Sequence, residues 1–208
     1  LAAFTGQLYR RKLGCQSRAV FPYDGRLRLL DSYLQQLERE SYGKSVTTVG
    51  RLPAGPSAPV TWGGVGTDAQ HAVFQLLHQG THLVRVEFVA SVESGDTLAP
   101  DHHRQLLINC LAQGAALMAG KQTDDPARSY AGDRPSTTIL LDRLDPRTLG
   151  ALIAFYEHRV FANAVLLGIN PFDQFGVELG KEIARQLDES GDHRSFDSST
   201  RALIERAG

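Results

Sequence analysis

Five short apolar runs alternate with longer stretches of helical periodicity, and this alternation restricts the fold more than any other feature of the chain. The apolar runs are residues 18–22, 60–62, 82–90, 137–144 and 163–169. Strands that alternate with helices favour parallel pairing, because each right-handed crossover returns the chain to the same edge of the sheet. The sequence therefore predicts an α/β domain with a parallel sheet of about five strands flanked by helices.

The stretches between these runs carry apolar residues at helical spacing. In residues 26–40, for example, Leu27, Leu30, Leu34 and Leu37 recur on one face. The expected helices are 1–14, 26–40, 67–79, 100–120, 145–159, 174–189 and 200–207. Residues 50–59 and 122–135 are expected to be loops, since they are rich in proline or in Asp and Gly. We assign residues 1–190 to one α/β domain and residues 191–208 to a tail with a short helix.

Composition excludes several classes of protein. Lys and Arg number 22 against 23 Asp and Glu, so the net charge is -1, which argues against a nucleic-acid binder and against a polybasic membrane-surface protein. No apolar run approaches the roughly 20 residues of a membrane span, and because the chain opens without the pattern of a signal peptide, secretion by one is not expected. With two cysteines and no CxxC motif, a reduced cytoplasmic setting is expected. The first residue is Leu1 rather than Met, so we expect excision from a longer polypeptide.

A glycine-rich segment follows the run 60–62. Gly64, Gly66 and Ala69 satisfy the loose dinucleotide fingerprint G-x-G-x-x-A. The acidic residue that should end the next strand is poorly matched, because Glu87 lies inside that strand and Glu93 lies beyond it. A tight turn from strand to helix accounts for the glycines equally well. A dinucleotide-binding domain therefore stays an alternative.

Two residues at helix ends are candidate acid–base groups. His71 falls in the first turns of helix 67–79, where the positive helix terminus favours a neutral imidazole. Glu40 ends helix 26–40, with Gly43 as the expected cap, and a helix C-terminus disfavours an ionised carboxylate, which suits a general base. Taken alone, the two patterns are more typical of a structural histidine and of a solvated glutamate.

Gln174 and Lys181 are candidate ligand-binding residues. They follow the run 163–169 and are seven residues apart, so they are expected on one helix face, two turns from each other. An amide and an ammonium there could bind an anionic, hydroxylated ligand. A surface ion pair between Glu178 and Lys181 is the alternative.

The adjacent residues Asp101, His102 and His103 suggest a metal cluster at first sight. Neighbouring side chains on a helix point apart, however, and no second group of residues has ligand spacing. We therefore expect no metal.

Residues 168–181, GINPFDQFGVELGK, strongly resemble the C-terminal signature of the glucose-6-phosphate isomerase (phosphoglucose isomerase) family. Further segments agree in the same order: FPYD at 21–24, ESYGK at 40–44, WGGVGTDAQH at 62–71, LHQGT at 77–81, DHH at 101–103, LGALI at 149–153, YEH at 156–158 and DSST at 197–200. The resemblance covers nearly the whole chain, but only the C-terminal part of a family member.

The resemblance implies a sugar-isomerase (SIS) fold and the interconversion of glucose 6-phosphate and fructose 6-phosphate, a step of glycolysis and gluconeogenesis. It implies a cis-enediol intermediate and no metal, nucleotide or other cofactor. Glu40 would move the proton between C1 and C2, His71 and Lys181 would assist ring opening, and Gln174 would contact the sugar phosphate. Family members are homodimers in which this histidine is lent to the neighbouring subunit's site.

The sequence departs from the family pattern in two ways. Tyr42 stands in place of the usual Asn, and Gly64-Val65 in place of Glu-Pro, at positions that are not catalytic in the family. The family's N-terminal sugar-isomerase domain, with its phosphate-binding loop and the Gly-Gly-Arg motif whose Arg stabilises the enediolate, has no counterpart in this sequence. We therefore expect the chain alone to be inactive. A non-catalytic sugar-phosphate binding or regulatory module is the alternative, although Glu40, His71 and Lys181 together favour an enzyme domain.

Overall fold

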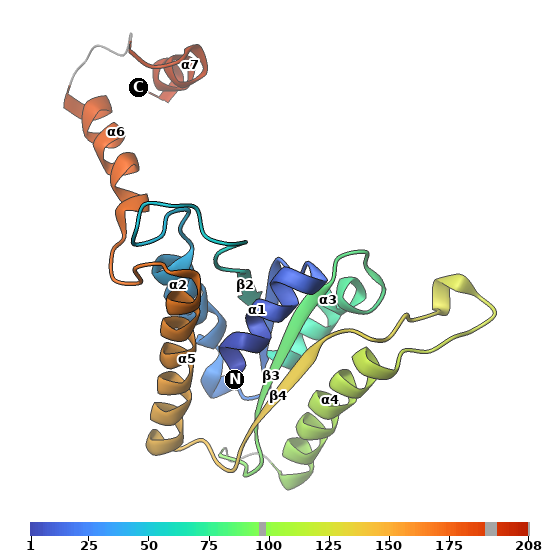
Figure 1. Cartoon of the computed structure of the whole chain (residues 1–208). Coiled ribbons are helices and arrows are strands. Elements are labelled where there is room, and N and C mark those ends of the chain that lie inside the picture. The colour runs from blue at the N-terminus through green and yellow to red at the C-terminus, as the bar shows by residue number, and fades with distance from the viewer. Residues whose placement is uncertain (96–98, 190–194, 208) are drawn as a thin grey trace. The chain divides into compact units, whose positions relative to one another are not determined.

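The computed structural model describes residues 1–95, 99–189 and 195–207, and it contains a parallel sheet (Figure 1). The strands are β1 (Ser17–Pro22), β2 (Val60–Gly63), β3 (Val84–Ser91) and β4 (Ser136–Leu141). Their order in the sheet is β2-β1-β3-β4, and every neighbouring pair is parallel. The predicted α/β class with a parallel sheet is therefore confirmed.

By its contacts the chain divides into two units, Leu1–Pro171 and Phe172–Gly208. The first unit, called here the sheet domain, contains the sheet and the first five helices. These are α1 (Ala2–Leu13), α2 (Leu30–Tyr42), α3 (Gly66–Gln79), α4 (Pro100–Ala119) and α5 (Pro146–Leu167). No helix in the described ranges is both long and apolar enough to cross a membrane.

The sheet is covered on both faces. Phe21 and Phe88 pack with α3 and α4 on one face, whereas Val20 and Val89 pack with α2 and α5 on the other. Successive strand residues point to opposite faces, so a strand covered on both sides must be apolar almost throughout. All eight residues of β3 are buried, as this arrangement requires.

The predicted fifth strand, residues 163–169, is wrong. Helix α5 runs on to Leu167, and Asn163 donates a hydrogen bond to the Arg159 carbonyl one turn earlier. The helix ends at Gly168, which adopts a left-handed conformation with φ of 67°. A short apolar run is consistent with a buried strand or a buried helix, and the glycine cap is the signal that favours the helix here.

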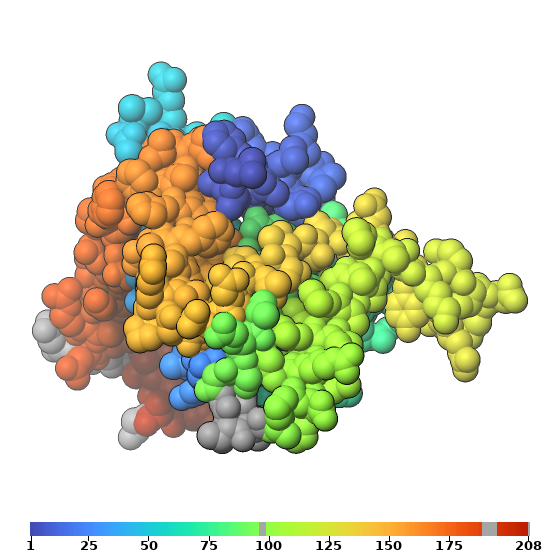
Figure 2. Space-filling model, turned by 90° about the horizontal axis from the view of Figure 1, so that it is seen from below, coloured from blue at the N-terminus to red at the C-terminus, as the bar shows by residue number. Residues whose placement is uncertain are grey.

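The two expected loops contain little regular structure. Residues 50–59 form no helix or strand. Residues 122–135 belong to an arm that projects from the sheet domain and is seen in yellow in Figure 2. The arm contains a short 3-10 helix, Pro126–Arg128, and is closed by an antiparallel bridge between Lys121 and Tyr130.

The second unit contains a 3-10 helix, Phe175–Val177, followed by α6 (Glu178–Glu189) and α7 (Ser198–Ala207). The predicted short final helix corresponds to α7, whose first turn is capped by the Asp197 carboxylate accepting from the Ser199 and Thr200 amides. The expected domain boundary between residues 190 and 191 lies outside the described residues.

Gly66 opens α3 against the ring of Tyr23, and a Cβ at this position would overlap that ring. Gly66→Ala is therefore expected to lower the free energy of unfolding by about 1–3 kcal/mol, as overpacking does. Gly64→Ala is the matched control, because its Cβ would meet only Ala69 at 3.9 Å, and it should change stability by less than about 0.5 kcal/mol. Chemical denaturation of both variants checks this, and equal effects would contradict it.

Candidate active site

Helix α2 runs antiparallel to the strands, and this direction decides where Glu40 lies. Near its start, Asp31 approaches Gly63 at the carboxyl end of β2. Near its end, Glu38 contacts Arg18 and Thr61 at the amino ends of β1 and β2. Glu40 therefore lies beside the amino edge of the sheet.

Glu40 is half-buried in the last turn of α2, three residues before the Gly43 cap. The Gln36 amide donates to its carboxylate at 3.5 Å. Glu40 also lines a cavity of about 310 Å³ together with Tyr33, Gln36, Leu37, Ser41 and Glu157. The predicted placement of Glu40 near the end of a helix is confirmed, although α2 begins at Leu30 and is preceded by a 3-10 helix, Gly25–Leu27.

His71 lies at the opposite edge of the sheet. It is the sixth residue of α3, which begins directly after β2, and its side chain is exposed. The preceding residue, Gln70, donates to the Tyr23 hydroxyl at 2.7 Å, and Tyr23 directly follows β1. Within one copy of the chain, the structure therefore does not bring His71 and Glu40 together at one edge.

Gln174 and Lys181 belong to the second unit, and both are exposed. The expectation that they share one helix face is wrong. Gln174 precedes the 3-10 helix Phe175–Val177, and α6 begins only at Glu178, so Gln174 is outside the helix that carries Lys181.

The sheet domain contains a buried ion network that the sequence-based predictions do not include. Arg18 of β1 donates to Glu38 at 2.6 Å and to Glu87 of β3 at 2.8 Å. Arg159 of α5 makes the same pair of contacts, to Glu38 at 3.3 Å and to Glu87 at 2.8 Å. All four side chains are at most 3% exposed. Each arginine thus bridges the two carboxylates and joins the sheet to α2 and α5.

Hydroxyl groups complete the network. Tyr156 donates to Glu87 at 2.7 Å, and Thr61 donates to the second oxygen of Glu38. The Tyr42 hydroxyl donates to Glu38 at 3.4 Å, which gives a structural role to the tyrosine that replaces the family's Asn. Burial alone would raise the pKa of Glu38 and of Glu87, but the arginines outweigh burial and lower both.

This network holds the end of α2 on the sheet immediately before Glu40. Glu38 contacts Thr61 of β2, and the next residue, Arg39, donates to the Thr61 carbonyl at 2.5 Å. The signal in the sequence was charge within apolar strands, because Arg18 and Glu87 both interrupt strand patterns. A buried charge requires a partner, and pairing these residues with each other would have predicted the network.

Comparison with known proteins shows which family the chain belongs to. A family model described as phosphoglucose isomerase matches residues 1–204. The chain belongs to the phosphoglucose isomerase family. Close packing of Gly66 on the Tyr23 ring accounts for that glycine without a bound nucleotide.

Relatives in this family are longer than the chain. Proteins named glucose-6-phosphate isomerase from Rhizorhabdus wittichii and Sphingopyxis alaskensis are 72% and 69% identical over 207 residues, which is 100% of this chain and 41% of each relative. A crystal structure of a glucose-6-phosphate isomerase from Chlamydia trachomatis superimposes with a TM-score of 0.87 at 36% identity, over 98% of this chain and 40% of that one. The chain thus spans about two fifths of the relatives it matches.

Among the residues that the structure describes, no group of three or more His, Cys, Asp or Glu side chains has the geometry to hold a metal ion. His103 of the DHH segment instead contacts the Val92 carbonyl at 2.8 Å through its Nε2 atom. His103 is therefore engaged in a local contact just after the end of β3.

Glu87→Gln is expected to lower the free energy of unfolding by about 3 kcal/mol, because Arg85 loses its carboxylate and the buried Arg18 and Arg159 must then share the single charge of Glu38. The pKa of Glu87 is lower in the folded than in the unfolded protein, so its stabilisation is present above the unfolded carboxyl pKa of about 4.3 and is lost as pH falls below it. The variant should therefore lose less stability on acidification than the wild type.

Denaturation at several pH values checks both expectations. Glu93→Gln is the matched control, since its partner Arg143 is 3.8 Å away and both side chains are more than half exposed. That control should stay within about 0.5 kcal/mol of the wild type. Equal effects of the two substitutions, or parallel pH profiles of Glu87→Gln and wild type, would contradict the role of the network.

Proposed function

We propose that this chain is the C-terminal sugar-isomerase domain of a cytoplasmic glucose-6-phosphate isomerase that interconverts glucose 6-phosphate and fructose 6-phosphate. Two observations support this proposal. Glu40 lies at a helix end that the buried network holds on the sheet. The chain also belongs to a family whose relatives are named glucose-6-phosphate isomerase. The other parts of the enzyme would supply a phosphate-binding loop and a cation for the enediolate. On this proposal the 208 residues alone are inactive.

In this mechanism Glu40 is the base. Its carboxylate removes the proton from C2 of the open-chain aldose, and the electron pair of that bond forms the C1–C2 double bond while the carbonyl π pair moves to O1, which takes up a proton to give a cis-enediol. Return of the proton from Glu40 to C1 uses the electron pair of the double bond, and the C2 hydroxyl releases a proton, equal to the one that O1 took up, as the C2 carbonyl of the ketose forms. The proton and electron count closes without a redox cofactor.

His71 and Lys181 would assist ring opening, and Gln174 would contact the sugar phosphate. His71 is exposed in the second turn of α3, where its imidazole can exchange a proton with the ring oxygen. Lys181 and Gln174 are exposed in the second unit, in the segment that carries the family signature. Exposure leaves these side chains available to a substrate.

The opposite positions of Glu40 and His71 support a homodimer. A site that contains both residues requires two copies of the chain, with the base from one subunit and the histidine from the other. A two-fold axis would generate two such sites.

Glu40→Gln in the full-length enzyme is expected to reduce isomerisation by about 10²–10⁴-fold, because the amide keeps the shape but cannot accept the C2 proton. Sugar-phosphate affinity should change little. A coupled spectrophotometric assay and calorimetric titration measure the two properties, with Glu205→Gln on α7 as an exposed control. A variant that keeps more than about a tenth of wild-type turnover would contradict the assignment, and would favour a binding module instead.

Mixed dimers test the shared site. Glu40→Gln and His71→Ala subunits, each nearly inactive alone, should recover about a quarter of wild-type activity when unfolded together and reassembled at equal amounts. Half of the dimers are then mixed, and each mixed dimer has one site with both native residues. Absence of recovery, with mixed dimers demonstrated by native mass spectrometry, would show that both residues act within one subunit.

A further inference from the structure

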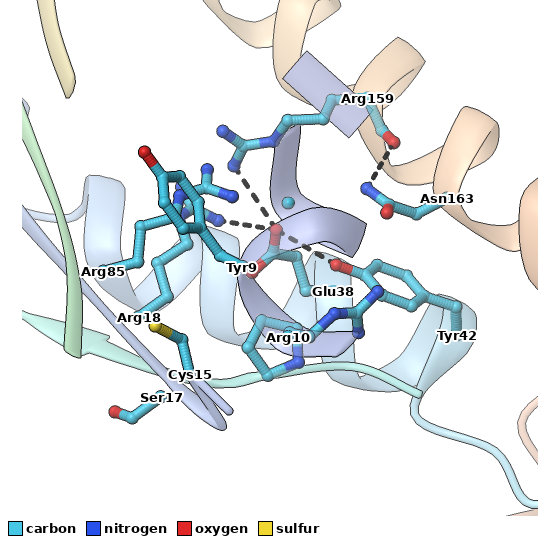
Figure 3. Close-up of a pocket in the computed structure, with 12 residues that line it drawn as sticks. Tyr9, Arg10, Cys15, Ser17, Arg18, Glu38, Tyr42, Arg85, Arg159 and Asn163 are labelled. Atoms are coloured by element: carbon cyan, nitrogen blue, oxygen red, sulfur yellow. Dashed lines mark hydrogen bonds and ion pairs between the residues drawn. The ribbon is translucent and has the colours of Figure 1, made fainter. Parts of the chain in front are cut away.

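A small cavity lies beside the buried network and is lined by four arginines. It encloses about 20 Å³, and its walls come from α1, β1, β3, α2 and α5 (Figure 3). A single water molecule needs about 10–15 Å³. The cavity therefore has room for one water-sized species and is far too small for a sugar phosphate.

Positive charge exceeds negative charge around this cavity. The lining includes Arg10, Arg18, Arg85, Arg159 and Glu38. Glu87, the other carboxylate of the network, pairs with three of these arginines. Four guanidinium groups and two carboxylates leave an excess of two positive charges in a buried region.

Several of the arginine donors also have no acceptor. Within the described ranges, both terminal nitrogens of Arg10 and the Nε atoms of Arg18 and Arg85 are buried without a hydrogen-bond partner. Arg10 is 7% exposed, Arg18 is 2% exposed and Arg85 is 9% exposed. The Arg10 guanidinium stacks near the Tyr42 ring at 5.6 Å, which offsets part of its charge but accepts none of its N–H groups.

Gly6 of α1 permits this crowding. A Cβ at Gly6 would lie 2.8 Å from a terminal nitrogen of Arg85, so a larger residue would push that arginine out of place. The chain thus brings Arg10 of α1 and Arg85 of β3 to one cavity although each repels the other.

We propose that this cavity binds one monovalent anion of the size of chloride, held by Arg10, Arg18 and Arg85. An anion satisfies several N–H donors at once and reduces the excess positive charge, whereas a water molecule accepts at most two hydrogen bonds and neutralises nothing. The bound anion joins α1 to the strands at the amino edge of the sheet. The inference does not depend on the isomerase reaction.

Crystals of the full-length protein grown with bromide in place of chloride test the proposal directly. A bromide anomalous peak is expected in the cavity, within contact of the Arg10 guanidinium, at bromide concentrations comparable to physiological chloride. A water molecule, an acidic side chain from elsewhere in the protein, or a peak that appears only at molar bromide (an adventitious ion only) would overturn it.

Thermal unfolding in chloride and in gluconate at equal ionic strength provides the second measurement. Chloride should raise the melting temperature of the wild type by on the order of 2 °C, because it binds the folded state alone. Arg10→Met should abolish this difference, whereas Lys12→Met, which removes an exposed charge two residues away, should keep it. No chloride effect in the wild type, or an undiminished one in Arg10→Met, would overturn the proposal. If Arg10→Met does not fold, the bromide experiment alone decides.

Discussion

The rest of the sheet domain depends on one buried ion network. In it, Arg18 and Arg159 each bridge the carboxylates of Glu38 and Glu87. They connect β1 and β3 in the sheet with α2 and α5 above it. Breaking one partner of such a pair is strongly destabilising, since it leaves an uncompensated charge in a low-dielectric interior. The network also fixes the last turns of α2 at the amino edge of the sheet, where Glu40 lies.

The topology of the sheet places the two candidate acid–base residues, His71 and Glu40, at opposite edges. In a parallel sheet, helices start at the carboxyl edge and end at the amino edge, so a residue early in α3 and a residue late in α2 lie at opposite edges. His71 and Glu40 are such a pair. Under the proposed function, a second copy of the chain would have to supply one of the two residues to each site, so assembly would be part of the proposed mechanism.

Much of the fold could be predicted from the sequence, because apolar periodicity reports burial directly. Four strands and the helices between them were found in this way. The run 163–169 was misassigned, since four or five apolar residues fit a buried strand as well as a buried helix. The candidate residues came from local helix-end patterns and family resemblance. The ion network was missed because Arg18 and Glu87, 69 residues apart, become partners only once β1 and β3 pair.

The central claim is that the buried network positions Glu40, and the kinetics of Glu38→Gln in the full-length enzyme test it most directly. Glu38 touches Arg18, Arg159 and Thr61 but points to the side of α2 away from the cavity that Glu40 lines. The account predicts that kcat falls by about tenfold or more at temperatures well below unfolding, with KM nearly unchanged, because small displacements of a catalytic group are costly. A lower melting temperature with an unchanged kcat would contradict it.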